Sequence, residues 1–161
     1  MPGSDLDLRG YFEVATKEES PGEAIRERIL RLESWMNTLE QADLPVNHHF
    51  AKGQYARELF IPKGVCLIGK IHKCEHLNII SKGDITVLTE TGMKRIIAPY
   101  TFVSRPGTKR VGLAHADTVW VTIHATEETD LEKIEEEVIA ASYEGLDGAA
   151  SANPKTLTGG A

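Results

Sequence analysis

The pattern of hydrophobic and polar positions separates a helical segment near the start of the chain from a long β segment. Within residues 20–44, apolar residues recur at steps of three and four, the spacing of one helix face. Ser20 and Glu23 form the ends of a capping box, and Pro21 occupies the first helical position. We therefore expect a helix over 20–41, whose apolar stripe comprises Ile25, Ile29, Leu32, Met36 and Leu39. This stripe fits either a cover over the protein's own core or a dimerisation surface.

Residues 45–128 follow a different pattern, in which short alternating or β-branched runs are separated by turn residues such as Pro62-Lys-Gly64 and Lys82-Gly-Asp84. Turn signals at intervals of about 8–12 residues are typical of a sandwich or barrel, not of βαβ units. The sequence thus predicts a mainly β domain. Its expected strands are 55–61, 65–69, 71–80, 85–89, 94–98, 100–104, 109–113 and 118–124.

A second amphipathic helix is expected at 129–144, with Thr129 as its N-cap and Glu132 at the box position. Its opposite face is acidic and is expected to be solvated. Residues 1–19 mix polar and isolated apolar residues and are expected to form an N-terminal arm. Residues 145–161 are rich in Gly, Ala, Ser and Thr, which is typical of a flexible tail.

Composition narrows the classes of function. A chain of 161 residues with 41% hydrophobic residues suits one globular domain. The net charge of −6 argues against nucleic acid as a partner, because phosphate-backbone binding requires a positive field. The sequence has no run of about 18 apolar residues, and its start lacks the features of a secretory signal. We therefore expect no membrane association and a cytoplasmic location, or a virion if the protein is encoded by a phage.

The chemistry of the chain is concentrated in 72–83. If 71–80 is one strand, then His72, Cys74, His76 and Asn78 lie on the same face, which would carry two imidazoles and a thiol. Residues four apart on a strand are about 13 Å apart at the backbone, too far to share one ion. A common metal would therefore require the strand to bend or bulge between His72 and His76.

The order of these residues resembles the first motif of the cupin superfamily, whose members include dioxygenases, isomerases and sugar epimerases. That motif runs from a glycine through a His-x-His pair and a glutamate to a closing glycine. Here Gly64 and Gly83 match the two glycines, His72 stands at the second histidine, and His76 stands at the glutamate. Lys70 occupies the place of the first histidine.

The second cupin motif is matched by Pro106 and Gly107, whereas Arg110 stands where the motif has its last histidine. The resemblance covers about residues 55–125 and implies a double-stranded β-helix, or jelly-roll barrel, with flanking N- and C-terminal helices. It also implies a metal held at the matched positions His72 and His76, in a motif that is degenerate at Lys70 and Arg110.

Three interpretations of the His72 and His76 pair remain open. In the first interpretation, both are ligands of one divalent transition metal such as Zn, Fe, Ni or Mn, assisted by Cys74, His115 or His124. Alternatively, a barrel without metal binds a small anion through Lys70, Arg110 and the histidines. In the third interpretation the histidines are hydrogen-bonded residues of a narrow barrel. Further candidates for a binding site are His115, in a turn at a barrel mouth, and Tyr55 with Arg57, which fit a pocket or an interface equally well. 

Two functions follow from these interpretations. The first is a small barrel that binds a divalent metal or a small polar or acidic molecule at its mouth. The second is a non-catalytic structural or assembly protein, for example a phage virion component, because the chain resembles in general style small cupin-like proteins encoded by bacteriophages. We expect a homo-oligomer, most simply a dimer, with attachment to a larger assembly through the arm and tail.

Overall fold

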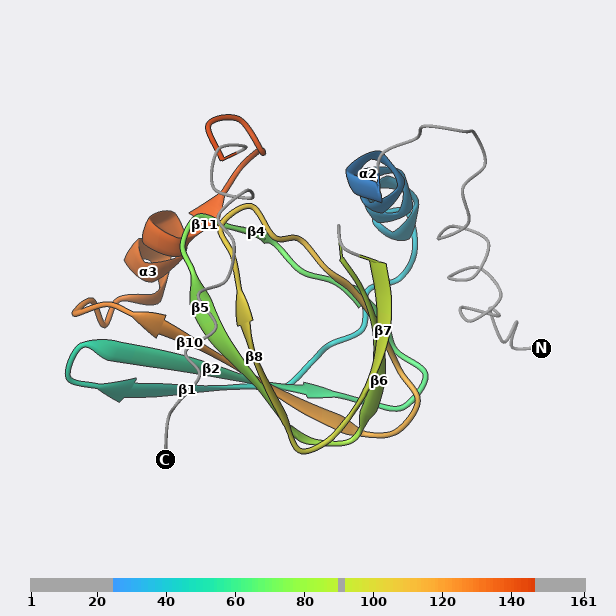
Figure 1. The fold of residues 1–161 in the computed structure, drawn as a ribbon, viewed down its shortest axis with the longest axis horizontal. Helices are drawn as coiled ribbons and strands as arrows, with labels where there is room; N and C mark the ends of the chain where they lie inside the picture. Colours follow the sequence, from blue (N-terminus) through green and yellow to red (C-terminus); the bar gives the residue numbers. More distant parts are fainter. Residues whose placement is uncertain (1–24, 90–91, 147–161) are drawn as a thin grey trace, which may run out of the picture.

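The computed structural model describes residues 25–89 and 92–146, and it forms a β-barrel with one helix before it and one after it (Figure 1). The mainly β architecture predicted from the turn spacing is thus confirmed. The expected arm at 1–19, the helix start at Ser20 and nearly all of the expected tail at 145–161 lie outside the described residues. Neither described helix is long and apolar enough to span a membrane.

Two antiparallel sheets form the barrel wall. The five-stranded sheet has the order β1-β2-β10-β5-β8 and the four-stranded sheet the order β3-β9-β6-β7. The strands of the first sheet are β1 (Val46–Ala51), β2 (Gln54–Ile61), β5 (His76–Lys82), β8 (Tyr100–Ser104) and β10 (Thr118–Ala125). Those of the second are β3 (Cys66–Ile68), β6 (Asp84–Thr89), β7 (Gly92–Ile97) and β9 (Val111–Ala114). A short third pair joins β4 (Ile71–His72) to β11 (Ile139–Ala140).

The apolar core lies between the inner faces of the two sheets. Because side chains alternate along a strand, every second residue of β2, β5, β6 and β10 points inward. The buried core residues are Leu59, Ile61, Ile80, Ile85, Val87, Ile96 and Ala114. Gly112 also faces inward, and a Cβ there would lie 3.0 Å from Cδ1 of Ile85, so the lack of a side chain allows close packing.

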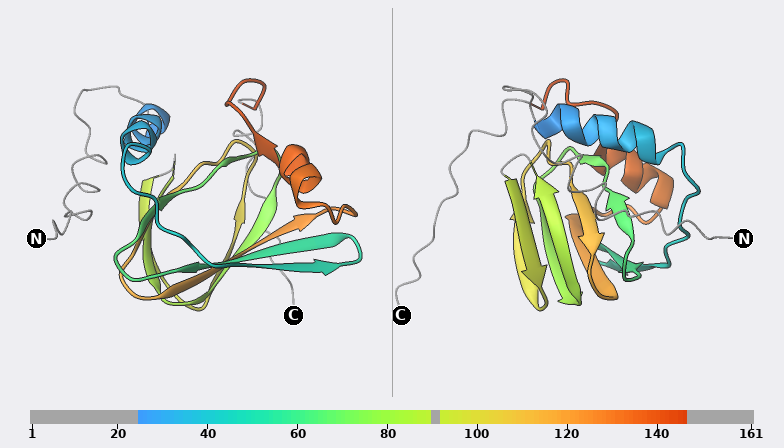
Figure 2. Two further views of the ribbon diagram at one scale, coloured as in Figure 1. Left: turned by 180° about the vertical axis from the view of Figure 1, so that it is seen from behind. Right: turned by 90° about the vertical axis from the view of Figure 1, so that its right-hand side faces the viewer.

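Helix α2 (Ile25–Met36) packs on the outer face of the four-stranded sheet (Figure 2). Ile29 and Leu32 of its apolar stripe are buried against Leu88, Val111 and Leu113. The stripe therefore covers the protein's own barrel, as in the first of the two interpretations above.

The predicted end of this helix near Gln41 is wrong, because α2 ends at Met36. Side chains that follow it bind the terminal carbonyls: Thr38 Oγ1 donates to Trp35 O at 2.7 Å, and Gln41 Nε2 donates to Met36 O at 2.8 Å. Such side-chain bonds compete with continuation of the backbone ladder.

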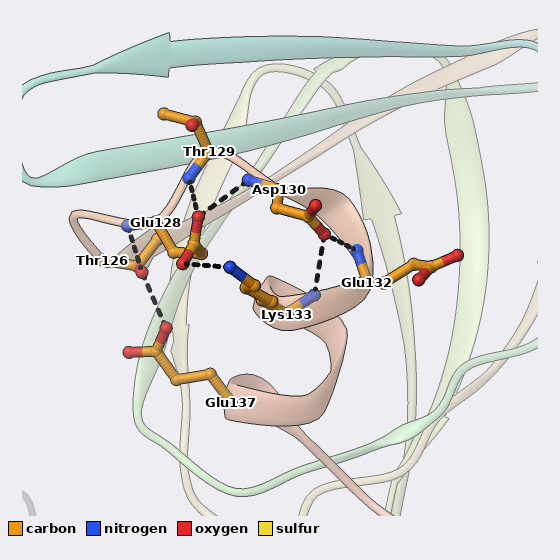
Figure 3. Close-up of polar contacts among 7 residues, drawn as sticks. All are labelled: Thr126, Glu128, Thr129, Asp130, Glu132, Lys133 and Glu137. Carbon is orange, nitrogen blue, oxygen red and sulfur yellow. Dashed lines mark hydrogen bonds and ion pairs between the residues drawn. The ribbon is translucent and has the colours of Figure 1, made fainter.

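Helix α3 (Leu131–Val138) begins one residue later than predicted, because Asp130 and not Thr129 is the N-cap. Oδ1 of Asp130 accepts hydrogen bonds from the backbone N–H groups of Glu132 and Lys133, at 3.0 and 3.2 Å (Figure 3). The carboxylate of Glu128 accepts from the N–H groups of Thr129 and Asp130. These bonds satisfy donors that a helix start otherwise leaves unpaired.

The expected continuation of this helix to residue 144 is also wrong. Ile139 is extended, with φ −108° and ψ 135°, and Ile139 and Ala140 pair with His72 and Ile71 as a strand. Pairing with β4 gives these residues backbone partners, whereas the last carbonyl groups of a helix have none within the helix.

Two further strand predictions are corrected. The single strand expected at 71–80 is divided into β4 and β5 by a bend at residues 73–75. Residues 48 and 49, which precede the first expected strand at 55–61, belong to β1, which pairs with β2 along its whole length. The other strands differ from the predicted ranges by a few residues at their ends.

Candidate metal centre

A cavity of about 600 Å³ opens between the two sheets. Its walls combine inward-facing residues of β2, β5 and β10 with residues near the ends of α2 and α3. A volume of this size is in the range of sites for small molecules.

Three histidines converge in this cavity from three separate strands. His72 ends β4, His76 begins β5, and His124 lies near the end of β10. The ring centroids are 4.2 Å apart for His72 and His76, 5.2 Å for His72 and His124, and 4.7 Å for His76 and His124. One nitrogen from each ring lies within 4.8 Å of the other two. The cluster thus has the composition of a three-histidine metal site.

The bend at residues 73–75 brings His72 and His76 together. It replaces the long backbone separation of a continuous strand by a turn, so that both rings enter the same cavity. The bend is fixed by the C-terminal segment, because Lys73 N donates to Val138 O at 2.8 Å and His72 pairs with Ile139. The Pro106-Gly107 segment adds a further bond, from Gly107 N to His72 O at 2.8 Å.

The register between β5 and β10 places His124 beside His76. Ile123 pairs with Leu77 in this antiparallel arrangement, so the next residues along, His124 and His76, stand side by side on the inner face. Their side chains are buried, with residue exposures of 4% and 5%.

Hydrogen bonding determines which ring nitrogens are available to a ligand. Nδ1 of His76 lies 3.0 Å from the carbonyl oxygen of Cys74, which can only accept, so Nδ1 carries the proton and Nε2 keeps its lone pair. Nδ1 of His72 and Nδ1 of His124 are buried with no hydrogen-bond partner among the described residues. An unpaired buried polar atom is costly, and a bound ion would satisfy it.

The electrostatic environment keeps these imidazoles neutral. Burial, together with His76, His124, Arg110 and Arg57, lowers the pKa of His72 to about 3. Burial and His76 lower the pKa of His124 to about 4. Burial also lowers the pKa of His76. Since a metal binds the neutral ring, the protein holds the cluster in the ligand form at neutral pH.

The donor set fits a transition metal. Imidazole ligands favour Zn, Fe, Ni and Cu over Mg and Ca. Bonds of about 2.0–2.1 Å to a tetrahedral ion place neighbouring nitrogens about 3.3 Å apart, which is less than the 4.8 Å that encloses the present cluster. Small side-chain rotations toward a common centre would close this difference.

Below the histidines, a polar network crosses the inner face of the five-stranded sheet. Trp120 Nε1 donates to Asn78 Oδ1 at 2.9 Å, and Asn78 Nδ2 donates to Ser104 Oγ at 2.6 Å. Arg110 donates to the same Ser104 oxygen, and its guanidinium lies 4.9 Å from the ring centroid of Phe102. The network fixes Arg110 beside the histidines.

The other residues singled out from the sequence occupy different positions. Lys70 lines the cavity but is ion-paired with Glu135 of α3. His115 is not among the residues that line the cavity; its Nε2 is 2.6 Å from Thr86 Oγ1, on the face of β6 opposite to Val87. Cys74 is exposed and contributes only its carbonyl oxygen. The structure thus brings Lys70 and Arg110 to the cavity and leaves His115 outside it.

Two cavity residues that the sequence left undecided, Tyr55 and Arg57, face inward from β2. The hydroxyl of Tyr55 is 2.7 Å from Nδ1 of His48. The sequence feature that indicates their inward position is the alternation of side chains along β2, which places Tyr55, Arg57 and Leu59 on one face. His124 could be recognised in the same way, since it alternates with Trp120 and Thr122 along β10.

Comparisons with known proteins give matches among solved structures. A scan against protein-family models finds no match, and a search of the curated proteins finds no significant one. Among solved structures, ectoine synthase from P. lautus aligns with a TM-score of 0.50 and 12% identity, over 63% of this chain and 78% of that one. A cupin domain from Bordetella pertussis Tohama I has a TM-score of 0.43 and 13% identity, over 55% and 98% of the two chains. The Schizosaccharomyces pombe Cnp3 cupin domain has a TM-score of 0.45 and 15% identity, over 63% and 71%.

At these identities the similarity concerns the fold. The chain forms a cupin-like jelly-roll barrel with a helix at each end, as the resemblance in sequence implied. What the barrel binds has to be argued from its own residues.

Proposed function

We propose that this protein binds one divalent transition metal through His72, His76 and His124 and presents it to a small molecule in the barrel cavity. The convergence of three neutral imidazoles, two of them with an unpaired buried nitrogen, carries this proposal. The site resembles the metal site that the cupin motif implies, with His124 supplying a ligand in place of those lost at Lys70 and Arg110.

A set of three histidine ligands suits a metal site that binds a further molecule better than it suits a purely structural metal site. Structural zinc sites are closed by four protein ligands, whereas sites with three protein ligands leave a position for water or a bound molecule. The cavity around the histidines supplies room for such a molecule. The hydrogen bond from His76 Nδ1 to the Cys74 carbonyl would hold the ring of His76 in the orientation in which Nε2 can bind the metal.

The test is elemental analysis of protein purified without a histidine tag, combined with thermal shifts in the presence of Zn, Fe, Ni and Mn salts. We expect about one metal ion per chain and a rise in Tm with at least one of these salts. His72→Gln, His76→Gln and His124→Gln should each reduce metal content strongly. His115→Gln, which alters a histidine outside the cavity, is the matched control and should retain the metal. A parent protein that contains no metal and shows no shift with any of the four salts would refute the proposal.

A further inference from the structure

The cavity is positively charged although the chain as a whole has a net charge of −6. Among the described residues, only two carboxylates line it, Glu33 and Glu135. Both are paired with lysines, Glu33 with Lys109 at 2.7 Å and Glu135 with Lys70. The opposite charges cancel within each pair. Among the described residues that line the cavity, this leaves Arg57 as a cation without an ion-pair partner.

The neutral histidines do not offset this positive charge, and a divalent ion would add to it. No carboxylate belongs to the cluster of His72, His76 and His124. A metal bound there would keep its full charge, in the same cavity as the guanidinium of Arg57. The missing negative charge has to come from the molecule that enters.

The two arginines are placed differently. Arg110 is held by Ser104 and by the ring of Phe102, as part of the network below the histidines. Arg57 is solvent-accessible, lines the cavity, and has neither a hydrogen bond nor an ion pair within residues 25–89 and 92–146. Burial is the main cause of the lowered pKa of His72, and the charge of Arg57 adds to it. Burial raises the pKa of Tyr55, and the charge of Arg57 opposes that rise. Its guanidinium is therefore available at the histidine cluster.

The register of β2 with β10 orders the cavity into three rows. Tyr55 pairs with His124, Arg57 with Thr122, and Leu59 with Trp120. Successive rows are about 6.8 Å apart, since each step spans two residues of a strand. The metal ligand, the cation and an apolar wall therefore follow one another along the same pair of strands. The apolar wall is continued by Met36, Leu44, Val65 and Leu67.

From this arrangement we infer that the ligand of the cavity is a small carboxylic acid with an apolar body. Its carboxylate lies between the metal centre and Arg57, and its body packs against Leu59 and Trp120. A guanidinium binds a carboxylate through two parallel hydrogen bonds, which makes Arg57 the residue that selects for the acid group. The inference rests on the proposed metal centre and adds the chemical class of the bound molecule.

The experiment uses full-length protein loaded with Co²⁺, whose visible absorption responds to changes in its ligands. Benzoate and octanoate are the probes, and benzamide is the neutral molecule of matched shape. Calorimetric titration should show binding of at least one of the two acids and a change in the Co²⁺ spectrum. Benzamide should bind at least about 10-fold more weakly, because it cannot form the charged pair.

Variants assign the acid contact to one residue. Arg57→Gln should weaken acid binding about 10- to 100-fold and leave cobalt content unchanged, which corresponds to the loss of one charged hydrogen-bonded pair. Arg57→Lys should restore part of the affinity. Lys70→Gln should have a smaller effect because Lys70 is paired with Glu135. Arg105→Gln, which removes a cation outside the cavity, should have none.

The outcomes separate this inference from the proposed metal centre. Bound cobalt without binding of either acid, equal binding of benzamide and benzoate, or unchanged affinity in Arg57→Gln would each overturn the inference and leave the metal centre standing. If cobalt is not retained, the metal centre fails, and the acids are titrated into metal-free protein. Binding that depends on Arg57 would then support the arginine's role, and no binding would overturn it.

Discussion

Trp120 donates the hydrogen of its indole Nε1 to Oδ1 of Asn78, 2.9 Å away across the five-stranded sheet. Asn78 is almost fully buried, at 2% exposure, and its amide also donates to Ser104. A polar side chain at the centre of a barrel is tolerated because both ends of its amide are satisfied. The network also sets the position of Trp120 in the cavity wall.

We predict that Asn78→Ala lowers the free energy of unfolding by about 1–3 kcal/mol, because it leaves the indole N–H without a partner in the barrel. Chemical denaturation measures this loss, and the tryptophan emission of the folded protein should change with it. Asn47→Ala is the control, since Asn47 is exposed and its side chain makes, within the described residues, a single 3.3 Å bond to Glu58. An Asn78→Ala variant as stable as the Asn47→Ala variant would contradict this role.

Gly83 and Gly64 both have positive φ, at 104° and 84°, but differ in the space around them. A Cβ at Gly83 would lie 2.3 Å from Thr118 Oγ1 and 2.6 Å from the Asp117 carbonyl oxygen. At Gly64, no atom of the part of the chain that the structure describes lies within 4 Å of the corresponding position. Gly64→Ala should therefore cost about 1 kcal/mol of backbone strain, and Gly83→Ala should cost more than about 3 kcal/mol or prevent folding. Equal melting temperatures for the two variants would exclude the steric explanation.

Ile29 is fully buried between α2 and the four-stranded sheet, whereas its neighbour Leu30 is 43% exposed. Ile29→Ala should destabilise the protein by about 2–4 kcal/mol, because it removes buried surface and leaves a cavity. Leu30→Ala should change stability by less than about 1 kcal/mol. Denaturant midpoints at constant m-value provide the comparison. Similar losses in both variants would mean that α2 does not bury the face described here.

The stability of the metal-free protein should fall in mild acid. The pKa of His72 is about 3 and that of His124 about 4 in the folded chain, against an ordinary value of 6.5. Between these values the unfolded chain binds more protons than the folded one, so the free energy of unfolding decreases as pH falls below 6.5. Above pH 6.5 the rings are neutral in both states and this dependence disappears.

The loss should amount to several kcal/mol by about pH 4, since each unit of pKa shift corresponds to about 1.4 kcal/mol. Urea titrations at a series of pH values measure it. The double variant His72→Gln, His124→Gln retains the carboxylates that also respond to acid, so the difference between the two proteins isolates the histidines. Parallel pH profiles for the parent and the double variant would contradict the prediction.

The mainly β architecture could be predicted from the sequence because the patterns that indicate helices, strands and turns are local. The stripe of Ile29 and Leu32 predicted an amphipathic helix, and turns such as the one at Gly83 predicted short strands. The site depended on relationships that local patterns do not contain. The spacing of His72 and His76 on one strand argued against a shared ion, and only the bend that Val138 and Ile139 fix from the other end of the domain brings the rings together.

The place of His124 in the cluster could not be predicted from local patterns either. Alternation along the strand puts His124 on the same face as Trp120, but it does not show which residue of another strand lies next to His124. That neighbour, His76, is determined by the register between β5 and β10. Arg110, in contrast, was located at the cavity by the position of the Pro106-Gly107 segment in the motif. Motif position thus located side chains near the centre, and strand pairing determined which of them meet.

The pairing of β11 with β4 has a consequence for the order of events during synthesis. His72 leaves the ribosome well before His124, and the bend behind His72 is complete only when Val138 and Ile139 have emerged and docked. A nascent chain that ends at Ala125 would carry all three histidines without the contact that aligns His72 with His76. Metal capture would therefore follow completion of the barrel, and a chain truncated after Ala125 would be a poor competitor for the cell's metal supply.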